Sequence, residues 1–504
     1  MRVPLEPPPG LTDDDTTFAT PGAWADGSNI RFAKGKAETI GPWFEAFAPL
    51  LTGACRNILS WTDNDGNVTI AFGTHSALQV LWSGAIHSIT PAGLTAGAIH
   101  SSGTAPGYGT GAYGTGTYSV PASQAFARTW SLDTWGENLL ASPRGGTLYH
   151  WQNDPLETAA EVANAPDEIT AIATTIERQV LALGCNEEVS GLFNPLCIRG
   201  CDLEDIDDWT TTATNNAFEL ILEGSGSIVT GRKLGPYVLV WTNVGLYMGQ
   251  FIGSPSQTYR FDLVALNCGL IGPNAVQIVG QTAIWISTDR QFRIWTPGVQ
   301  PRILECPIWS DFADNLDESQ PVKIAAAEVS KFSEVWFHYP DLRDASPGEN
   351  SRYVAVAIDP LTGSWRTWFR GAMERTAFTD AGVAAYPIGV DADGRAWYHE
   401  NPQGDPVDWT LRTTDTYVGE GDQAAEIQRF VPDFEEQDAS ISLALRLRKE
   451  PRSAVVTKGP YVIGAGDVRK DLRASGRIMT VELSGTGRMR LGKPQFEAVV
   501  RGRR

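Results

Sequence analysis

The sequence predicts an all-β protein whose main part is a large β-propeller-like body of about six or seven blades. Its 504 residues include 51 Gly, 31 Pro and 17 Trp but 5 Met. This composition favours tight turns and aromatic-rich strands over long helices. Strand-like runs with at least one Trp return about every 40 to 50 residues, which is typical of propeller blades. A stack of β-sandwiches is the alternative, because the repeat is degenerate.

Residues 1–55 are expected to form an N-terminal arm followed by the first strands. The start of the chain is rich in Pro and Asp, which predicts an extended arm rather than a packed element. Asp26-Gly27 and Lys34-Gly35 separate short runs of alternating large and small residues, and such dipeptides are typical of tight turns between strands. We expect these first strands to pack with a platform formed by the C-terminal domain.

Residues 56–427 are expected to form the propeller-like body. Pairs of strand-like runs recur in it, such as ILSW with NVTIAFGT around Trp61 and EVWFHYP with RYVAVAID. The motifs DNDGN, from Asp63, and DADG, from Asp391, each lie between two such runs. We interpret them as hairpin turns rather than calcium loops, because Gly takes the positive φ that a turn requires.

A low-complexity insert, residues 96–121, interrupts this body. It has almost no aliphatic side chains, so it cannot bury enough surface to offset the entropy of ordering. Tyr108, Tyr113 and Tyr118 recur at regular intervals in it. We expect a flexible spacer. The alternative is a tip or lumen loop that becomes ordered when neighbouring subunits or another protein pack onto it.

Residues 428–504 are expected to form a separate, β-sandwich-like basic domain. In its run ASISLALRLRK, period-two alternation turns the leucines inward and the arginines outward. From Ser440 to Arg504 there are 15 Lys and Arg against 5 Asp and Glu, a net +10 that leaves −29 for residues 1–439. This basic surface is a candidate for docking to an acidic neighbour, since complementary charge steers association. A solvated basic surface is the alternative. The candidate docking residues are Arg446, Arg448, Arg488, Arg490 and Arg501.

No metal or cofactor is expected. Cys197 and Cys201 have three residues between them, and no second close Cys or His pair accompanies them, as a structural zinc site normally requires. The acidic run from Asp202 to Asp208 lacks the spacing and the Gly of an EF-hand loop. We therefore expect a solvated turn that leads into a buried Trp209. The six Cys are too sparse for a disulfide framework, which predicts reduced thiols.

The sequence also lacks the common catalytic motifs. Its six His are scattered, and it has no HExxH, no Gly-x-Ser-x-Gly and no Gly-Lys-Ser/Thr phosphate loop. We expect no enzyme, and a β-propeller protein that acts on glycans or binds a cell surface is the alternative, because Asp and Glu are plentiful. The net charge of −19 argues against clamping of a nucleic-acid backbone. No apolar run approaches the about 20 residues of a membrane span, and we expect no signal peptide.

Several segments carry a resemblance to a known family. They are PGAWADGSNIRF from Pro21, CIRGCDLEDIDDW from Cys197, LNCGLIGPNA from Leu266, KFSEVWFHYP from Lys331 and GRMRLGKPQFEAVVRGRR from Gly487. In this order, over nearly the whole chain, they resemble the tail nozzle proteins of short-tailed bacteriophages. This family is also called packaged-DNA stabilisation or tail tubular B-like proteins.

The resemblance implies a homo-hexameric conduit in the virion, made in the host cytoplasm and placed below the portal and its adaptor. It implies a tail fibre or tailspike and a distal needle or plug as further partners, and it brings no catalytic residues. Double-stranded DNA would pass through transiently and without specificity. An acidic wall would let DNA slide, because DNA carries about one negative charge per 1.7 Å of its axis and a basic lumen would hold it.

Overall fold

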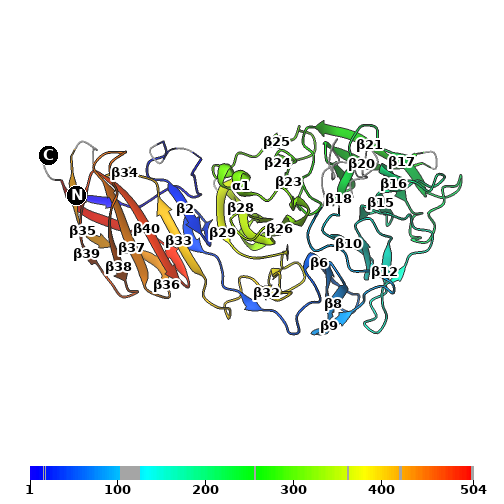
Figure 1. Ribbon diagram of the computed structural model, residues 1–504, viewed down its shortest axis with the longest axis horizontal. Coiled ribbons are helices and arrows are strands. Elements are labelled where there is room, and N and C mark those ends of the chain that lie inside the picture. Colours follow the sequence, from blue (N-terminus) through cyan, green and yellow to red (C-terminus); the bar gives the residue numbers. More distant parts are fainter. Residues whose placement is uncertain are drawn as a thin grey trace, which may run out of the picture.

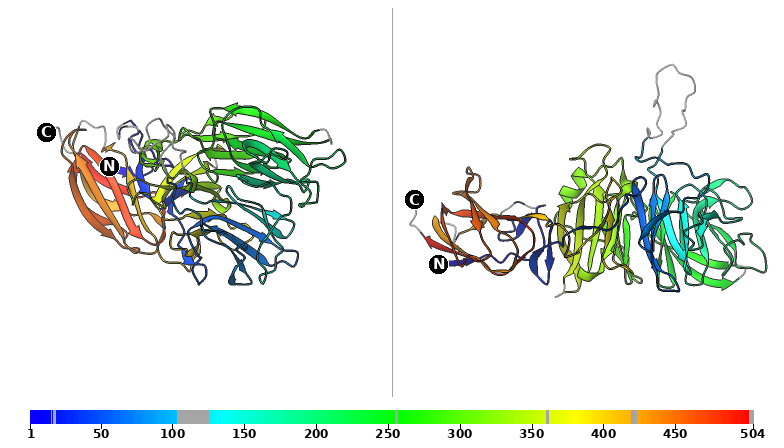
Figure 2. Two further views of the ribbon diagram at one scale, coloured as in Figure 1. Left: turned by 45° about the vertical axis from the view of Figure 1, so that its right-hand side comes forward. Right: turned by 90° about the horizontal axis from the view of Figure 1, so that it is seen from below.

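The polypeptide forms two β bodies, a propeller and a smaller platform, which lie one after the other along the long axis of the molecule (Figures 1 and 2). The computed structural model describes residues 1–14, 16, 19–102, 125–254, 257–359, 362–418 and 423–500. Among these residues no helix has the length and apolarity needed to cross a bilayer. The short helices are α1 (Trp309–Asn315), η1 (Pro321–Lys323) and η2 (Ser330–Phe332).

Seven sheets in the described part of the chain, each of four antiparallel strands, form the propeller. In blades 1 to 6 the chain runs as a meander from the innermost strand to the outermost. The strands are, blade by blade, β6 (Cys55–Thr62), β7 (Val68–Thr74), β8 (Leu78–Trp82) and β9 (Ala85–Ser88); β10 (Trp130–Trp135), β11 (Asn138–Pro143), β12 (Tyr149–Trp151) and β13 (Ala160–Glu161); β14 (Ala171–Thr174), β15 (Val180–Asn186), β16 (Phe193–Gly200) and β17 (Phe218–Ile221); β18 (Ile228–Leu234), β19 (Tyr237–Thr242), β20 (Gly245–Ser254) and β21 (Gln257–Leu266); β22 (Val276–Val279), β23 (Thr282–Ile286), β24 (Phe292–Trp295) and β25 (Arg302–Ile303); β26 (Ala325–Val329), β27 (Glu334–Pro340), β28 (Asn350–Asp359) and β29 (Ser364–Ala372); β30 (Ala377–Thr379), β31 (Ile388–Val390), β32 (Ala396–Tyr398) and β5 (Phe44–Glu45).

The ring closes through blade 7, which takes its outermost strand from the N-terminal region. β5 pairs with β32 in the register Trp397 with Glu45 and Tyr398 with Phe44. The amide of Ala46 extends this pairing by donating to the carbonyl of Ala396 at 2.8 Å. Because one sheet contains strands from both ends of the propeller sequence, separating blade 1 from blade 7 requires breaking a β ladder. The sequence prediction of an all-β propeller is confirmed, and the blade number is seven.

The inner strands of all seven blades run in the same direction. Four antiparallel strands bring the chain back to the side of the blade where it began, so each following blade repeats the first direction. The ring therefore has two different ends. We call the end at which the inner strands begin the N-terminal mouth.

Adjacent blades are held together by buried aromatic side chains. Trp61 of blade 1 and Trp151 of blade 2 meet edge to face, with ring centroids 6.4 Å apart. Trp241 of blade 4 and Trp285 of blade 5 meet in the same way at 5.8 Å. Burying one such side chain contributes about 1.5–3 kcal/mol, so the Trp residues that recur in the sequence stabilise the blade interfaces.

The platform combines strands from both ends of the chain in three sheets. In order across each sheet they are β1 (Arg2–Pro4), β42 (Gln495–Val500), β35 (Ala425–Val431) and β39 (Lys470–Gly476); β2 (Trp24–Ser28), β33 (Asp408–Thr413), β40 (Ile478–Thr486), β37 (Ile441–Arg448) and β38 (Val456–Ile463), with β34 (Thr416–Tyr417) also on β40; and β3 (Ile30–Ala33), β4 (Lys36–Thr39), β41 (Met489–Leu491) and β36 (Phe434–Gln437). On β37, Leu443, Leu445 and Leu447 are buried while Arg446 and Arg448 are partly exposed, as period-two alternation predicts.

These pairings divide the chain differently from the ranges expected from the sequence. β33 lies inside the expected body, 56–427, yet it pairs with β2 and β40. Its Trp409 and Leu411 are buried in the platform core. β5 lies inside 1–55 yet completes blade 7. The change of composition near residue 428 marks where the charge of the chain changes, whereas long-range strand pairing decides which body a strand joins.

Ion pairs cross the junction between the two bodies. Arg370 of β29 approaches Asp26 of β2 at 3.0 Å, Asp13 of the N-terminal segment at 2.6 Å and Asp311 of α1 at 3.2 Å. The guanidinium of Arg370 in the propeller thus contacts two carboxylates outside it, that of Asp13 in the N-terminal segment and that of Asp26 in the platform. A cavity of about 330 Å³ borders the network on the junction side.

Candidate functional site

The inner strands enclose an axial cavity of about 340 Å³. All seven blades contribute to its wall, so it is the one place where the whole propeller converges. Its charged lining residues are Arg56 of β6, Asp133 of β10, Arg232 and Lys233 of β18, Glu328 of β26 and Asp380 after β30. Among the described residues this cavity is therefore the first candidate for a ligand site in a propeller.

Arg232 connects blades 4 and 5 at the wall of the axial cavity. Its guanidinium donates to the Pro273 carbonyl at 3.1 Å, to Asn274 Oδ1 at 3.1 Å and to Thr230 Oγ1 at 2.9 Å. Burial lowers the pKa of Arg232, although Asp133 opposes that shift. Carbonyl and hydroxyl acceptors thus satisfy this guanidinium without a direct ion pair among the described residues.

Acidic groups face the same cavity from blades 6 and 7. Burial raises the pKa of Glu328, and the nearby Asp380 raises it further. Asp380 accepts a hydrogen bond from the Ser330 amide at 3.3 Å. The cavity therefore carries charges of both signs. This arrangement is typical of a wall whose polar groups find their partners within the protein.

Asn274 closes the cavity toward the N-terminal mouth. Its Nδ2 donates to the carbonyl of Arg56 at 3.0 Å, which joins blade 5 to blade 1 across the axis. Its own carbonyl accepts from the Ala326 amide of blade 6 at 2.7 Å. One asparagine thus contacts three strands of the ring, and a wide solute cannot pass through the propeller along its axis.

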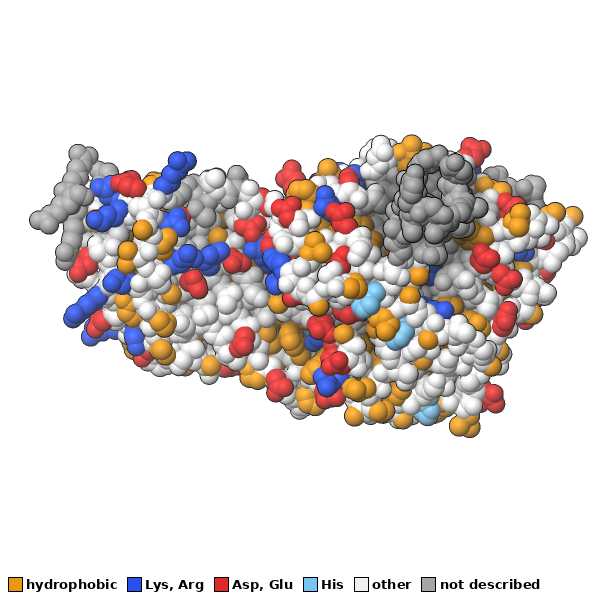
Figure 3. Space-filling view, in the orientation of Figure 1, with side chains coloured by type: hydrophobic (Ala, Val, Ile, Leu, Met, Phe, Trp, Pro, Cys, Tyr) orange, Lys and Arg blue, Asp and Glu red, His pale blue; other side chains and the backbone are white. Residues whose placement is uncertain are grey.

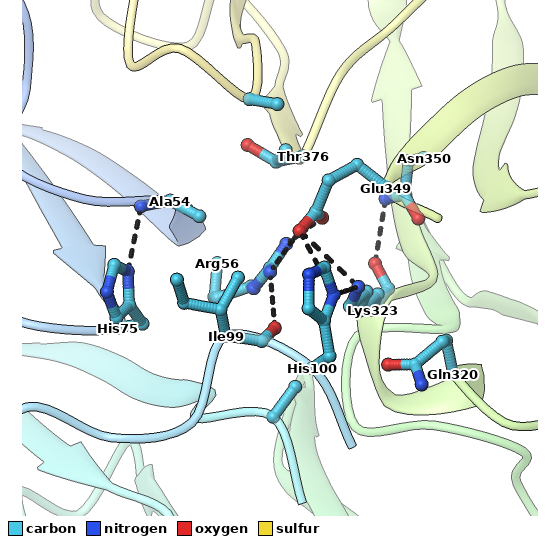
Figure 4. Close-up of polar contacts among 12 residues, drawn as sticks. Ala54, Arg56, His75, Ile99, His100, Gln320, Lys323, Glu349, Asn350 and Thr376 are labelled. Carbon is cyan, nitrogen blue, oxygen red and sulfur yellow. Dashed lines mark hydrogen bonds and ion pairs between the residues drawn. The ribbon is translucent and has the colours of Figure 1, made fainter. Parts of the chain in front are cut away.

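A buried polar cluster lies at this mouth (Figure 4). Arg56 donates to both carboxylate oxygens of Glu349, at 2.6 and 2.9 Å, in a bidentate pair. Lys323 Nζ lies 3.3 Å from Glu349 Oε1, 2.7 Å from the Gly348 carbonyl and 2.6 Å from His100 Nδ1. His100 Nδ1 itself is 3.7 Å from Glu349.

Burial and mutual charge interactions shift the pKa values of Lys323, Glu349 and His100 in this mouth cluster. Burial lowers the pKa of Lys323 to about 8, because Glu349 only partly compensates and Arg56 adds repulsion. Burial would raise the pKa of Glu349, but its pairing with Arg56 and Lys323 lowers that pKa overall. Burial and Lys323 lower the pKa of His100. The Lys323 side chain is fully buried, which keeps it from acting on a solute.

The mouth cluster also anchors the chain on the near side of the insert. Arg56 Nη2 donates to the Ile99 carbonyl at 2.9 Å. Gln320 accepts from the Ser101 amide at 2.8 Å and donates back to its carbonyl at 2.9 Å. The arrangement can therefore hold blade 1, blade 6 and the segment ending at Ser102 in one position. Sequence reasoning missed it because its members come from distant segments without a local motif.

The candidate docking arginines of the platform divide into two groups. Arg448 pairs with Asp415 at 2.8 Å, and Arg490 pairs with Glu435 at 3.1 Å. Arg446 and Arg488 form no ion pair within the described chain, and Arg488 is exposed. Arg501 lies outside the described residues, as do Tyr108, Tyr113 and Tyr118 of the insert.

Acidic residues in the other segments of the platform offset most of the basic charge of the C-terminal segment. Residues 1–41 and 408–504 together contain 21 Lys and Arg against 20 Asp and Glu, a net +1, which leaves −20 for residues 42–407. Figure 3 shows the Lys and Arg side chains gathered at the platform end of one face. The +10 of the C-terminal segment is thus a local feature of a nearly neutral body.

The loop between Cys197 and Trp209 belongs to the packing of blade 3. Burial raises the pKa of Cys201 to about 12, and a hydrogen bond with Cys185 together with burial raises the pKa of Cys197. Asp202 Oδ1 accepts from the amides of Leu203 at 2.8 Å and of Asn216 at 2.7 Å. Trp209 is buried, and its indole donates to the Ile206 carbonyl at 2.6 Å. Within the residues that the structure describes, no group of His, Cys, Asp and Glu has the arrangement of a metal site.

Comparisons with known proteins give a distant structural similarity. No protein-family model matches the chain, and no curated protein matches it. Among solved structures, the chain is similar to the β-propeller domain of Cps50 (Swd1) from Myceliophteria thermophila. The match has 10% identity and a TM-score of 0.39, and it covers 69% of this chain and 98% of that chain.

Proposed function

We propose that the chain is a structural subunit of the tail of a short-tailed bacteriophage. In this proposal copies of the chain form a hexameric nozzle below the portal and its adaptor, retain the packaged genome and let it pass on ejection. Two features support it. Nozzle-like segments occur in order along the sequence, and a seven-bladed propeller is joined to a platform built from both ends of the chain.

The uneven charge of the two bodies is the observation that carries this proposal. Residues 42–407, which include the propeller, have 19 Lys and Arg against 39 Asp and Glu. A surface of the same sign as DNA releases no counterions to it and does not hold it. At physiological salt the field decays over about 8 Å, so the effect requires propeller surfaces close to the duplex.

The path for DNA would run between subunits in such an assembly. The axial cavity of one propeller, at about 340 Å³, is the size of a small-molecule pocket, and Asn274 crosses its mouth. The propeller would therefore be a wall element, while the ring of subunits would form the conduit.

The platform would supply contacts to the adaptor or to neighbouring subunits. Arg446 and Arg488 have no ion pair within the described chain, whereas Arg448 and Arg490 are engaged in internal pairs. We therefore assign docking to Arg446 and Arg488, together with Arg501. A tail fibre or tailspike and a distal needle or plug complete the proposed set of partners.

Electron microscopy of the purified chain, alone and with its virion neighbours, tests the proposal. Rings with six-fold symmetry are expected. A triple variant with Arg446→Glu, Arg488→Glu and Arg501→Glu should remain folded but fail to assemble. Arg302→Glu on the exposed β25 is the matched control and should assemble normally. A monomer that depolymerises a capsular glycan, or that binds the host surface saturably without forming rings, would contradict the nozzle.

DNA binding gives a second, independent measurement. The assembled ring should not bind a duplex DNA oligonucleotide at low salt in fluorescence anisotropy, because like charges dominate. Binding that weakens steeply with added salt would reveal a basic DNA path and rule out the acidic wall.

A further inference from the structure

A groove of about 510 Å³ lies on the face of the propeller that surrounds the N-terminal mouth. It runs over the starts of the inner strands of blades 2, 3 and 4, and it is separate from the axial cavity. Its apolar walls come from Phe126, Phe193, Pro195 and Ile228. Phe126 is 49% exposed and Phe193 is 44% exposed, so two large apolar side chains face solvent across one depression.

Two arginines and one exposed carboxylate, that of Glu168, line this groove, and neither arginine is paired with Glu168. Arg128 Nη1 donates to the Thr95 carbonyl at 2.6 Å, and Arg144 Nη1 donates to the Val229 carbonyl at 3.0 Å. Neither side chain forms an ion pair within the part of the chain that the structure describes. Burial lowers the pKa of both, that of Arg144 to about 10, and Tyr149 partly opposes the shift of Arg128. Each guanidinium keeps further N–H donors for a ligand.

The fold brings the two arginines to the same end of blade 2. Arg128 precedes β10, and Arg144 follows β11 directly. The amide of Arg144 donates to the Thr129 carbonyl at 3.0 Å, which continues the β10–β11 pairing to this point. Arg128 packs over Gly97, where a Cβ atom would collide with Arg128 Nε. The absence of a side chain at Gly97 thus leaves room for the side chain of Arg128, whose guanidinium is fixed by its hydrogen bond to the Thr95 carbonyl.

The lining identifies the chemical class of the ligand. Paired guanidinium groups recognise carboxylates through charge-assisted hydrogen bonds, which strengthen where water is scarce. Walls formed by Phe and Pro recognise large apolar side chains, which the phosphates of nucleic acid do not offer. The net −20 of residues 42–407 also opposes the approach of a polyanion. A short peptide with one acidic group satisfies all three conditions.

We propose that this groove binds a peptide segment of a partner protein in which an Asp or Glu lies next to a large apolar side chain. Residues 103–124 of this chain, which lie outside the described residues, contain no Asp or Glu. That segment therefore cannot supply the carboxylate. The proposal rests on the groove alone and does not depend on a role in a virion.

Selection of random displayed peptides on the full-length chain tests the proposal. The enriched peptides should place an Asp or Glu beside Leu, Ile, Phe or Trp, and a labelled peptide should bind in fluorescence polarisation. Arg144→Met should weaken the binding of the labelled peptide at least about tenfold, as expected for loss of a charge-assisted hydrogen bond. Phe193→Ser should also weaken it, while Arg302→Met is the matched control and should bind normally. Thermal unfolding checks each variant, and Arg128→Met replaces Arg144→Met if the latter does not fold.

Three outcomes would overturn the proposal. The first is enrichment of peptides that lack an acidic residue, or binding of the labelled peptide by the Arg128→Met and Arg144→Met variants as tight as its binding by the wild type. The second is binding of a duplex DNA oligonucleotide that these substitutions abolish, which would make the groove a phosphate site. The third is self-association in light scattering that Arg144→Met abolishes, which would make a second copy of the chain the occupant. Normal ring assembly by Arg144→Met would leave the nozzle proposal unaffected in each case.

Discussion

The guanidinium of Arg31 on β3 of the platform donates two hydrogen bonds to the carboxylate of Glu334 on β27 of the propeller, at 3.0 and 3.2 Å. Both side chains are nearly inaccessible, at 1% and 2% exposure. Arg31 also pairs with Glu400 at 2.8 Å and stacks on Phe332, 3.6 Å from the ring centroid. One buried arginine therefore couples the platform to blades 6 and 7, and the stability of the two bodies should be linked.

Replacing Arg31 should destabilise the whole protein. Arg31→Met leaves the buried carboxylate of Glu334 beside that of Glu400 without a cation, and breaking a buried pair in this way costs about 3–5 kcal/mol. The free energy of unfolding in denaturant measures the loss. Arg446→Met, on the partly exposed side of β37, is the control. A loss of less than about 0.5 kcal/mol for Arg31→Met would show that the pair does not couple the two bodies.

Closure of the ring should depend on the backbone of Ala46. Ala46→Pro removes the amide that donates to the Ala396 carbonyl. An edge strand that loses a ladder hydrogen bond in this way opens more often. Hydrogen exchange should then accelerate in β30 to β32 and in β6, the strands beside the closure. Ala46→Gly keeps the N–H and should retain most of the protection. Unchanged exchange in the proline variant would mean that β5 does not hold blade 7.

Lys323 should produce a pH dependence in the alkaline range. Its pKa is about 8 in the folded protein against an ordinary value of 10.5. Between these values the unfolded chain binds more protons than the folded protein, so the free energy of unfolding rises as pH increases from about 8 to about 10.5. The contribution is at most about 3 kcal/mol.

The difference in unfolding free energy between the wild type and Lys323→Met isolates this contribution. Denaturation series across the alkaline range should show the wild type gaining stability relative to the variant. Lys233→Met removes an exposed lysine of the axial cavity and should keep the wild-type slope. Parallel curves for the wild type and Lys323→Met would contradict the shifted pKa.

The two arginines of β37 should differ in their effect on stability. Arg448 pairs with Asp415, which is 3% exposed and also accepts from Thr480 Oγ1 at 2.6 Å. Arg448→Met should therefore cost about 1–3 kcal/mol, since a buried carboxylate loses its cation. Arg446→Met should stay within about 0.5 kcal/mol. If Arg446→Met and Arg448→Met lost equal stability in thermal unfolding, the distinction between an internally paired arginine and a docking arginine would be contradicted.

The propeller could be predicted from local patterns because each blade is local. β6 to β9 and the strands of blades 2 to 6 are consecutive in the chain, so alternation and turn residues reveal them one after another. The place of β5 in blade 7 and of β33 in the platform could not be predicted. The pairing of β5 with β32 and that of β33 with β2 each join segments hundreds of residues apart. No pattern within a short strand identifies the strand with which it pairs.

The mouth cluster and the groove could not be predicted from the sequence either. Arg56 and Glu349 are 293 residues apart, and neither lies in a recognisable motif. Arg128 and Arg144 are close in sequence, but whether an arginine has an acidic partner depends on which strands surround it. The same reason separates Arg448 from Arg446 on one strand.

The sequence by itself determined that the protein is all-β, that its blades recur with buried Trp residues, and that its C-terminal segment is basic. These properties follow from composition and periodicity, which act over a few residues. The tertiary structure decided how the ring closes, which arginines are paired and that the platform as a whole carries a net charge of only +1. These properties depend on long-range strand pairing, because only the fold brings Asp415, Glu38 and Glu435 beside the basic strands that they neutralise.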